Sequence, residues 1–152
     1  MKKTLAFGCD HGGFSLKEAL VPYLRRRGWA VRDFGAFCET SMDYPDTAEK
    51  VACAVARGRA WRGILICKSG IGNSIAANKV RGVRAALCYN LKAARMSRRH
   101  NDANVLVLGA LFVSCPTAKK ICDAWLKTAF EGGRHARRLR KIERIEQRCV
   151  RV

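Results

Sequence analysis

The chain has 152 residues, and 49% of them are hydrophobic. This length is enough for one domain with a substantial core, and this composition excludes an intrinsically disordered chain. The formal net charge of +18 predicts attraction to anions. Phosphorylated metabolites, nucleic acids and acidic surfaces are all compatible with that charge.

The start of the chain and the cysteines indicate a cytoplasmic protein. No apolar run approaches the length of a membrane span, and the start MKKTLAFGCDHGG has too short an apolar run for a good signal peptide. The eight cysteines include no CxxC pair, and several fall inside apolar periodic segments. Free thiols in a reducing compartment are therefore expected, rather than a disulfide framework or a zinc site.

Hydrophobic periodicity predicts strands that alternate with helices. In chain order, the expected elements are a strand over 4–9, a helix over 14–27, a strand over 29–34, a helix from Asp46 or Thr47 to Arg57, a strand around 64–67, a helix from Ile75, a strand over 84–88, a helix over 91–100, a strand over 105–108, a helix over 116–130 and a last helix over about 134–147. This alternation predicts an α/β fold with a doubly wound, parallel, five-stranded sheet, helices on both faces and a C-terminal helix. A single domain over residues 1–152 is expected.

The stretch GILICKSGIGNSIAAN, from Gly63 to Asn78, combines a buried strand, a small flexible loop and a helix start. Cys67 ends the strand, and residues 69–74 form the expected loop. Open α/β sheets bind ligands at this kind of place, and a helix N-terminus favours negative charge, including that of a thiolate. A buried cysteine before an ordinary glycine turn is the alternative, but the loop chemistry favours a functional site.

Polar side chains adjoin three of the expected strands. Asp10 and His11 follow the first strand, Cys67 and Ser69 follow the third, and His100, Asn101 and Asp102 precede the fifth. Because the carboxyl ends of parallel strands share one edge of the sheet, the first two groups are expected to converge. His100 ends a helix and is expected at the opposite edge, so it would join the same site only from another subunit.

Several well-known motifs are absent from the sequence. Asn73 stands where a tyrosine-phosphatase loop needs arginine, and Ile75 stands where GxGxxG needs its third glycine. No GxxxxGK[ST] loop occurs, and no spacing of histidines or cysteines indicates a metal site. An enzyme with this sequence is expected to use side chains alone, with no metal or cofactor.

The last expected helix has an apolar face and a basic face. The apolar face consists of His135, Leu139, Ile142 and Ile145, and the solvated basic face of Arg137, Arg140, Arg144 and Arg148. Arg134 and Arg138 stand one turn apart at the border between the faces. This spacing suits a phosphate clamp, with helix capping and surface roles as the alternatives.

The sequence contains five segments in one order between Met1 and about Gln147: GCDHGG, SMDYPD, ILICKSGIGNSIAANKVRGVRAALC, SRRHNDANVL and EGGRH. Together they resemble ribose-5-phosphate isomerase B, a family that includes relatives acting on allose and galactose 6-phosphates. The resemblance implies a Rossmann-like α/β fold and a homodimer or dimer of dimers. It also implies a metal-free aldose–ketose isomerase of the pentose phosphate pathway.

The resemblance implies a role for each matching position. Cys67 corresponds to the base that moves a proton between C1 and C2 of the sugar through an enediol, and Asn73 replaces a glutamate that another branch of the family uses instead. His100 corresponds to the group that opens the furanose ring. The anion hole for the enediolate corresponds to Ser69 and the N–H groups of Gly70, Ile71, Gly72 and Asn73. Contacts to the sugar are implied for Asp10, Tyr44 and Asn101, and contacts to the phosphate for His11, Arg134 and Arg138.

Two positions depart from the family pattern. Lys68 stands where many members have a small residue, and Leu111 stands where many have an arginine that reaches the phosphate from the partner subunit. These departures bear on phosphate binding and on the length of the sugar. The expected reaction is therefore the interconversion of ribose 5-phosphate and ribulose 5-phosphate, with the same chemistry on a hexose 6-phosphate as an alternative.

A second alternative comes from another class, a weakly active basic α/β protein that binds polyanions such as RNA. The high net charge supports it. The basic helix lacks interleaved aromatic residues, which weakens it. We expect a small phosphorylated sugar as the substrate and no membrane partner.

Overall fold

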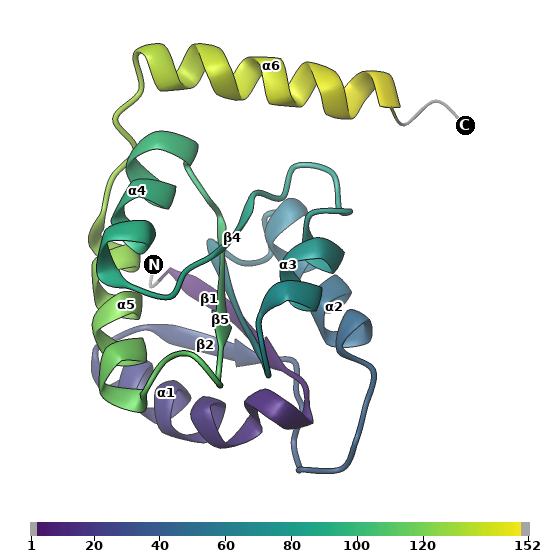
Figure 1. The fold of residues 1–152 in the computed structure, drawn as a ribbon, viewed down its shortest axis with the longest axis vertical. Coiled ribbons are helices and arrows are strands. Elements are labelled where there is room, and N and C mark those ends of the chain that lie inside the picture. The colour runs from purple at the N-terminus through teal and green to yellow at the C-terminus, as the bar shows by residue number, and fades with distance from the viewer. Residues whose placement is uncertain (1–2, 150–152) are drawn as a thin grey trace.

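The chain folds around a five-stranded parallel sheet with the strand order β2-β1-β3-β5-β4. A computed structural model describes residues 3–149 (Figure 1). The strands are β1 (Thr4–Cys9), β2 (Ala30–Asp33), β3 (Arg62–Cys67), β4 (Ala85–Leu87) and β5 (Val105–Gly109). The helices are the 3-10 turn η1 (His11–Gly13), α1 (Phe14–Arg26), α2 (Tyr44–Ala56), α3 (Ile71–Ala77), α4 (Leu91–Asn101), α5 (Cys115–Lys127) and α6 (Arg134–Cys149). The predicted α/β fold with a five-stranded parallel sheet is confirmed.

The central strands are buried on both faces. Every residue of β3 and β5 is buried, which explains their nearly continuous apolar runs. In the sheet register, Cys9 of β1 lies beside Ile66 of β3, and Cys67 lies beside Gly109 of β5. The three central strands therefore end at the same level, and the turns that follow them share one edge of the sheet, called here the carboxyl edge.

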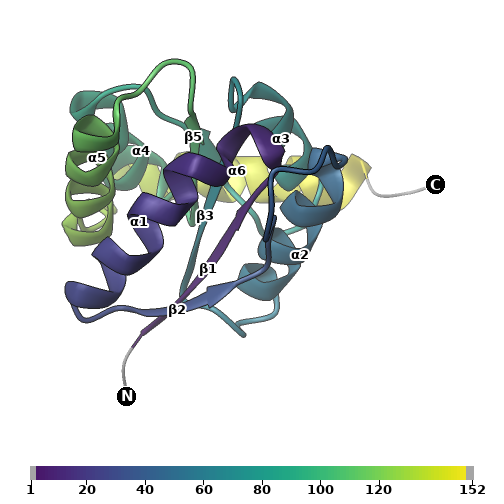
Figure 2. The same ribbon diagram turned by 90° about the horizontal axis from the view of Figure 1, so that it is seen from below.

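Helices cover both faces of the sheet (Figure 2). Helices α1, α4 and α5 enclose a core that contains the fully buried Trp125 and Phe7. Helices α2 and α3 cover the other face, where the core is built largely from alanine and valine side chains such as Ala48 and Val51. Small side chains let these two helices lie close to the strands, and this holds the start of α3 against the end of β3.

Helix α6 lies across the opposite end of the sheet, called here the amino edge (Figure 1). Its apolar face is only partly used within the chain. His135 and Leu139 are buried, whereas Ile142 is 49% exposed and Ile145 is 51% exposed. A cavity of about 630 Å³ lies between this second half of the helix and the residues around β4. The far half of α6 therefore presents apolar surface that this chain leaves open.

Two helix starts differ from the expected ones. Helix α2 begins at Tyr44 rather than at Asp46 or Thr47, with Asp43 as the residue before it. Pro45 favours the first helical turn, because its missing N–H would have no partner there. Helix α3 begins at Ile71 rather than at Ile75, so most of the expected loop is the first turn of the helix. Hydrophobic periodicity did not predict this turn, because it contains glycine, asparagine and serine in place of apolar residues.

Among the described residues, no helix combines the length and the apolar character that crossing a membrane requires. All eight cysteines are free thiols, and Cys9, Cys67, Cys88 and Cys122 are buried.

Candidate active site

The turns after β1 and β3 meet at the carboxyl edge of the sheet. The Asp10 N–H donates to the Ile66 carbonyl over 3.2 Å, which fixes the first turn beside the end of β3. The buried Asp10 carboxylate accepts a hydrogen bond from the Gly13 N–H over 3.1 Å, so it caps η1. His11 is exposed, and its Nδ1 accepts from the Met42 N–H over 3.2 Å. Asp10 and His11 thus border the loop that follows Cys67.

Cys67 is buried, with 4% of its surface exposed, at the last position of β3. Its sulfur accepts a hydrogen bond from the Gly70 N–H over 3.1 Å. Next to it, the Ser69 hydroxyl oxygen accepts from the Ile71 N–H over 3.2 Å. A thiol at a strand end that faces backbone N–H donors can hold negative charge as a thiolate, which is the form that acts as a base or nucleophile.

The first turn of α3 supplies further donors. The Ser74 N–H donates to the Gly70 carbonyl over 3.0 Å. The N–H groups of the residues before Ser74 therefore have no acceptor within the helix. Asn73 is buried, and its side-chain amide makes no hydrogen bond within the described part of the chain. The turn therefore offers backbone and side-chain groups with unused hydrogen-bonding capacity beside Ser69.

Tyr44 forms a wall against this turn. A Cβ added to Gly72 would lie 2.5 Å from the Tyr44 ring and 2.9 Å from its hydroxyl oxygen. The ring can therefore lie on the backbone of α3 only because residue 72 is glycine. The late helix start expected from the sequence would have placed Tyr44 in a loop, whereas it opens α2 and is held by that helix.

His100, Asn101, Arg134 and Arg138 lie at the amino edge. His100 and Asn101 end α4 just before β5, and the two arginines are exposed on the first turns of α6. The His100 ring stacks on His135 with a centroid separation of 4.3 Å and an angle of 11° between the ring planes. The predicted site residues are therefore divided between two edges of the sheet, and one chain does not bring them together.

Glu131 completes the surroundings of His100. One of its carboxylate oxygens lies 3.8 Å from His100 Nε2 and 3.7 Å from His135 Nε2, and the carboxylate also pairs with Arg99. The hydrogen bond from Arg99 holds the pKa of Glu131 below its usual range. Burial, followed by the charges of His100 and Arg134, lowers the pKa of His135. An ionised carboxylate thus lies beside two stacked imidazoles.

The ligand atoms of His100, Glu131 and His135 lie within 4.8 Å of one another, a grouping that the sequence spacing did not indicate. A metal bound to an imidazole lies near the plane of that ring, about 2.0–2.1 Å from the nitrogen. Two rings stacked 11° from parallel cannot both direct an in-plane lone pair at one ion. In this arrangement the His135 ring and the Glu131 carboxylate both lie against His100.

Sequence reasoning did not single out two charged residues that the structure makes prominent. Glu131 stands four residues before His135, ahead of the first residue of α6, and this i, i+4 spacing was the available signal. Lys17 is 1% exposed, and its Nζ donates to Asp33 over 2.7 Å. No spacing rule indicates that pair, because it joins α1 to β2.

Comparison with known proteins now defines the family. The model described as Ribose/Galactose Isomerase matches residues 5–142. The chain belongs to the ribose/galactose isomerase family. It is 51% identical to ribose-5-phosphate isomerase B of Escherichia coli over 96% of this chain and 98% of that protein.

Solved structures of other family members agree with this assignment. The ribose-5-phosphate isomerase B of Clostridium thermocellum superimposes with a TM-score of 0.94 at 52% identity, covering 95% of this chain and 98% of that one. The Mycoplasma genitalium enzyme, solved with bound ribulose-5-phosphate, has a TM-score of 0.92 at 42% identity, covering 97% of this chain and 98% of that one. The Rossmann-like fold implied by the sequence segments is therefore that of solved isomerases in this family.

Proposed function

We propose that this family member interconverts ribose 5-phosphate and ribulose 5-phosphate through an enediol intermediate. The observation that carries the proposal is the buried Cys67 sulfur at the end of β3, which accepts the Gly70 N–H beside the first turn of α3. Relatives of about half identity that span nearly the whole chain are ribose-5-phosphate isomerases B. Membership in the family and the position of the thiol support the same reaction.

Cys67 is the base in this proposal. It removes the proton from C2 of the open-chain aldose as a thiolate and returns a proton to C1 of the enediolate, which produces the ketose. Asn73 stands in the same turn, where another branch of the family has a glutamate. A side-chain amide does not accept a proton at neutral pH, so the thiol is the proton-transfer group available at this end of β3.

The turn around Ser69 stabilises the enediolate. Negative charge develops on the oxygen atoms of C1 and C2 as the proton leaves carbon, and donors fixed in advance lower the free energy of that state. Ser69, together with the N–H groups of Gly70 to Asn73, forms this anion hole when the Gly70 and Ile71 N–H groups turn from the Cys67 sulfur and the Ser69 oxygen to the enediolate. Asp10 and Tyr44 hold sugar hydroxyls beside it. The unused amide of the buried Asn73 supports a polar ligand at this place.

A second copy of the chain supplies the remaining groups. His100 and Asn101, together with Arg134 and Arg138 on α6, lie at the amino edge, away from Cys67. In a two-fold homodimer, His100 of one copy opens the furanose ring in the site that contains Cys67 of the other. The two arginines then hold the phosphate together with His11. A dimer of dimers can be built from the same pair.

Exposed apolar side chains support this assembly. Ile71 and Ile75 lie on the outer side of α3, and Leu111 and Phe112 lie in the loop after β5, all more than half exposed near the carboxyl edge. On α6, Ile142 and Ile145 are about half exposed beside the 630 Å³ cavity. Exposed apolar side chains that gather on one face mark contact surfaces, and a second copy that covers these residues would bring the two edges together.

We propose that the enzyme works in the cytoplasm and needs no metal or cofactor. Its free thiols suit a reducing compartment, and the chemistry proposed for Cys67 and His100 requires only side chains and backbone N–H groups. The nearby grouping of His100, Glu131 and His135 acts on ring opening by orienting His100.

Direct assay of the purified protein tests the function. The protein should convert ribose 5-phosphate to ribulose 5-phosphate, with a kcat/KM well above that for allose 6-phosphate measured under the same conditions. A higher kcat/KM for the hexose phosphate would support the same mechanism with a different substrate. The comparison is worth making because Leu111, which is exposed near the site, stands where many family members have an arginine. No turnover with either sugar would contradict the proposal.

A further inference from the structure

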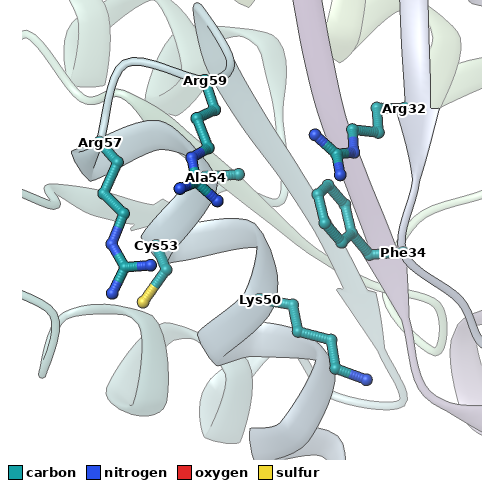
Figure 3. Close-up of a pocket in the computed structure, with 7 residues that line it drawn as sticks. All are labelled: Arg32, Phe34, Lys50, Cys53, Ala54, Arg57 and Arg59. Atoms are coloured by element: carbon teal, nitrogen blue, oxygen red, sulfur yellow. The ribbon is translucent and has the colours of Figure 1, made fainter.

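A basic groove lies between β2 and α2, outside the proposed active site. It has a volume of about 210 Å³. Figure 3 shows its two walls, with Arg32 and Phe34 from the β2 side and Lys50, Cys53, Arg57 and Arg59 from α2 and the turn that follows it. Helix α2 has 13 residues and is therefore about 20 Å long. Tyr44 at its start borders the active site, whereas Arg57 and Arg59 follow its far end.

The groove gathers four cationic side chains without a carboxylate among the described residues that line it. The pleat of β2 explains the separation of charges on its wall. Successive side chains of a strand point to opposite faces, so Arg32 and Phe34 face the groove, whereas Asp33 faces α1. There Asp33 pairs with Lys17 over 2.7 Å and is not available to neutralise the groove.

The four cations also lack partners elsewhere within residues 3–149, where none of them forms an ion pair. Other cations of the same chain do meet a carboxylate, as Arg84 and Arg98 meet Asp102. All four side chains are exposed, so water and salt screen much of their mutual repulsion. A bound anion would offset the repulsion that remains. Basic residues after a helix can complement the helix dipole, which accounts for Arg57 and Arg59 but not for Arg32 on a strand.

The size and chemistry of the groove indicate a small, highly charged ligand. Sites for drug-sized ligands usually enclose about 300–1,000 Å³ and are mostly apolar, whereas this groove is smaller and lined by guanidinium and ammonium groups. The Arg32 guanidinium lies over the Phe34 ring, 5.0 Å from its centroid. Such stacking orients a guanidinium, and an oriented guanidinium binds phosphate oxygens in pairs.

We propose that this groove binds a small anion with two or more linked phosphate groups. Arg32 lies on one side of the groove and Arg57 and Arg59 lie on the other (Figure 3), so a chain of phosphates that spans the groove can contact both sides. Lys50 contributes a fourth charge from α2. The ligand is either a free polyphosphate or the phosphate chain of a nucleotide, since both present the same oxygens to these groups.

Titration calorimetry with inorganic tripolyphosphate tests the site. The full-length protein with Arg134→Ala and Arg138→Ala is used, because the proposed substrate-phosphate groups could otherwise bind the same probe. This protein should bind tripolyphosphate saturably at constant ionic strength. Adding Arg57→Ser and Arg59→Ser should raise the dissociation constant by roughly tenfold or more. Bound tripolyphosphate should also slow alkylation of the Cys53 sulfur, which lines the groove, and leave that of the exposed Cys149 unchanged.

A matched control removes the same charge elsewhere. Arg26→Ser with Lys92→Ser alters two exposed residues of α1 and α4 outside the groove, and it should leave the dissociation constant within about twofold. Lys50→Gln alone and the pair Arg57→Ser with Arg59→Ser should weaken binding more than this control pair does. If neither does, the affinity comes from the net charge of the protein and the proposed anion site is overturned.

Two further arms identify the ligand class. A nucleoside triphosphate that binds more tightly than tripolyphosphate, and that also protects Cys53, would identify a nucleotide as the occupant, whereas equal affinity would identify the phosphate chain alone. Binding of a single-stranded oligoribonucleotide with no measurable binding of tripolyphosphate would overturn the proposal in favour of a nucleic-acid surface. In wild-type background, the Arg57→Ser and Arg59→Ser pair should keep the isomerase activity, because neither residue belongs to the catalytic machinery.

Discussion

At the scale of single residues, the position of the Cys67 thiol depends on the backbone of Gly70. Gly70 has a φ angle of +83°, and a Cβ at this position would lie 2.4 Å from a Leu87 methyl group. A left-handed backbone is accessible to glycine without steric cost. It turns the chain so that the Gly70 N–H donates back to the Cys67 sulfur. One glycine therefore sets both the start of α3 and the polarity around the thiol.

Substitution of Cys67 by alanine should abolish most isomerase activity. Loss of a proton-transfer group typically lowers the rate by about 10²–10⁴-fold, and removal of one buried sulfur should leave the fold in place. We expect kcat with ribose 5-phosphate to fall by at least this factor while the circular dichroism spectrum stays that of the wild type.

Two other cysteines provide the matched controls for this substitution. Cys38 and Cys149 are exposed and are not among the residues proposed to touch the substrate, so Cys38→Ala and Cys149→Ala should retain nearly full activity. Wild-type turnover by Cys67→Ala would show that a different group moves the proton.

Metal removal should leave the reaction unchanged. The rings of His100 and His135 are stacked, with an angle of 11° between their planes. Because the two planes are nearly parallel, both rings cannot direct a lone pair at one ion. Dialysis against EDTA should therefore not alter kcat or KM. A loss of activity on dialysis that a divalent cation restores would show that the rings separate to coordinate a metal.

The pH dependence of stability should carry a contribution from His135. Burial lowers its pKa in the folded chain below the ordinary value of 6.5, so the unfolded chain binds a proton more readily. Stability is therefore fully retained above about pH 6.5 and decreases as the pH falls from there toward the lowered pKa of the folded state. Melting temperatures at fixed protein concentration should fall more between pH 7 and pH 5.5 for the wild type than for His135→Gln. An equal decrease in the melting temperatures of the two proteins would mean that His135 does not contribute to the pH dependence of stability.

At the scale of elements, α6 carries two kinds of arginine. Arg134 and Arg138 follow the edge of the face that buries His135 and Leu139, so their charges lie near His135, whose ring stacks on His100. Arg140 and Arg144 lie on the outer face and are exposed. The sequence periodicity distinguished these pairs, and the structure adds that the first pair shares the amino edge with His100 through the contact between α4 and α6.

Substitutions in the two pairs should therefore have different effects. Arg134→Ala and Arg138→Ala should each raise KM with little change in kcat, because the phosphate is held in the ground state and the transition state alike. A lost hydrogen bond between charged groups corresponds to about 1.5–3 kcal/mol, or roughly 10- to 150-fold in KM.

Arg140→Ala and Arg144→Ala are the controls on the same helix and should stay within about twofold of the wild type. Equal damage from all four substitutions would favour a general electrostatic attraction of the substrate over a specific clamp.

At the scale of the whole molecule, the proposed site requires two copies of the chain. Cys67 ends a strand, and His100 ends a helix that leads into the next strand, so the depth of the sheet separates them. A two-fold dimer that brings the amino edge of one copy to the carboxyl edge of the other contains two sites, each with Cys67 from one copy and His100 from its partner.

Hybrid dimers test this arrangement. Cys67→Ala and His100→Ala proteins should each be nearly inactive. When the two are unfolded together and refolded as an equal mixture, random pairing makes about half of the dimers hybrids with one intact site of two, so roughly a quarter of the wild-type activity should return. If tagged hybrids can be isolated and remain inactive, Cys67 and His100 do not share a site across two chains.

The sequence by itself determined the architecture and the edge of the sheet at which the turns after β1 and β3 lie. Alternating apolar segments specify a parallel sheet because strands buried on both faces and helices with one apolar face can pack in few ways. The order of strands and turns then brings Asp10 and Cys67 to one edge, since β1 and β3 are parallel neighbours. The opposite location of His100 follows from the same reasoning, because the end of a connecting helix lies at the start of the next strand.

Only the tertiary structure decided the features that depend on contacts between distant segments. The stacking of His100 on His135, the wall that Tyr44 forms on Gly72, and the pairing of buried Lys17 with Asp33 each join different elements. The basic groove likewise joins Arg32 of β2 to Arg57 and Arg59 beyond α2. Local periodicity reports which face of an element is apolar. Which side chains meet across two elements depends on packing and register, which no single segment of the sequence contains.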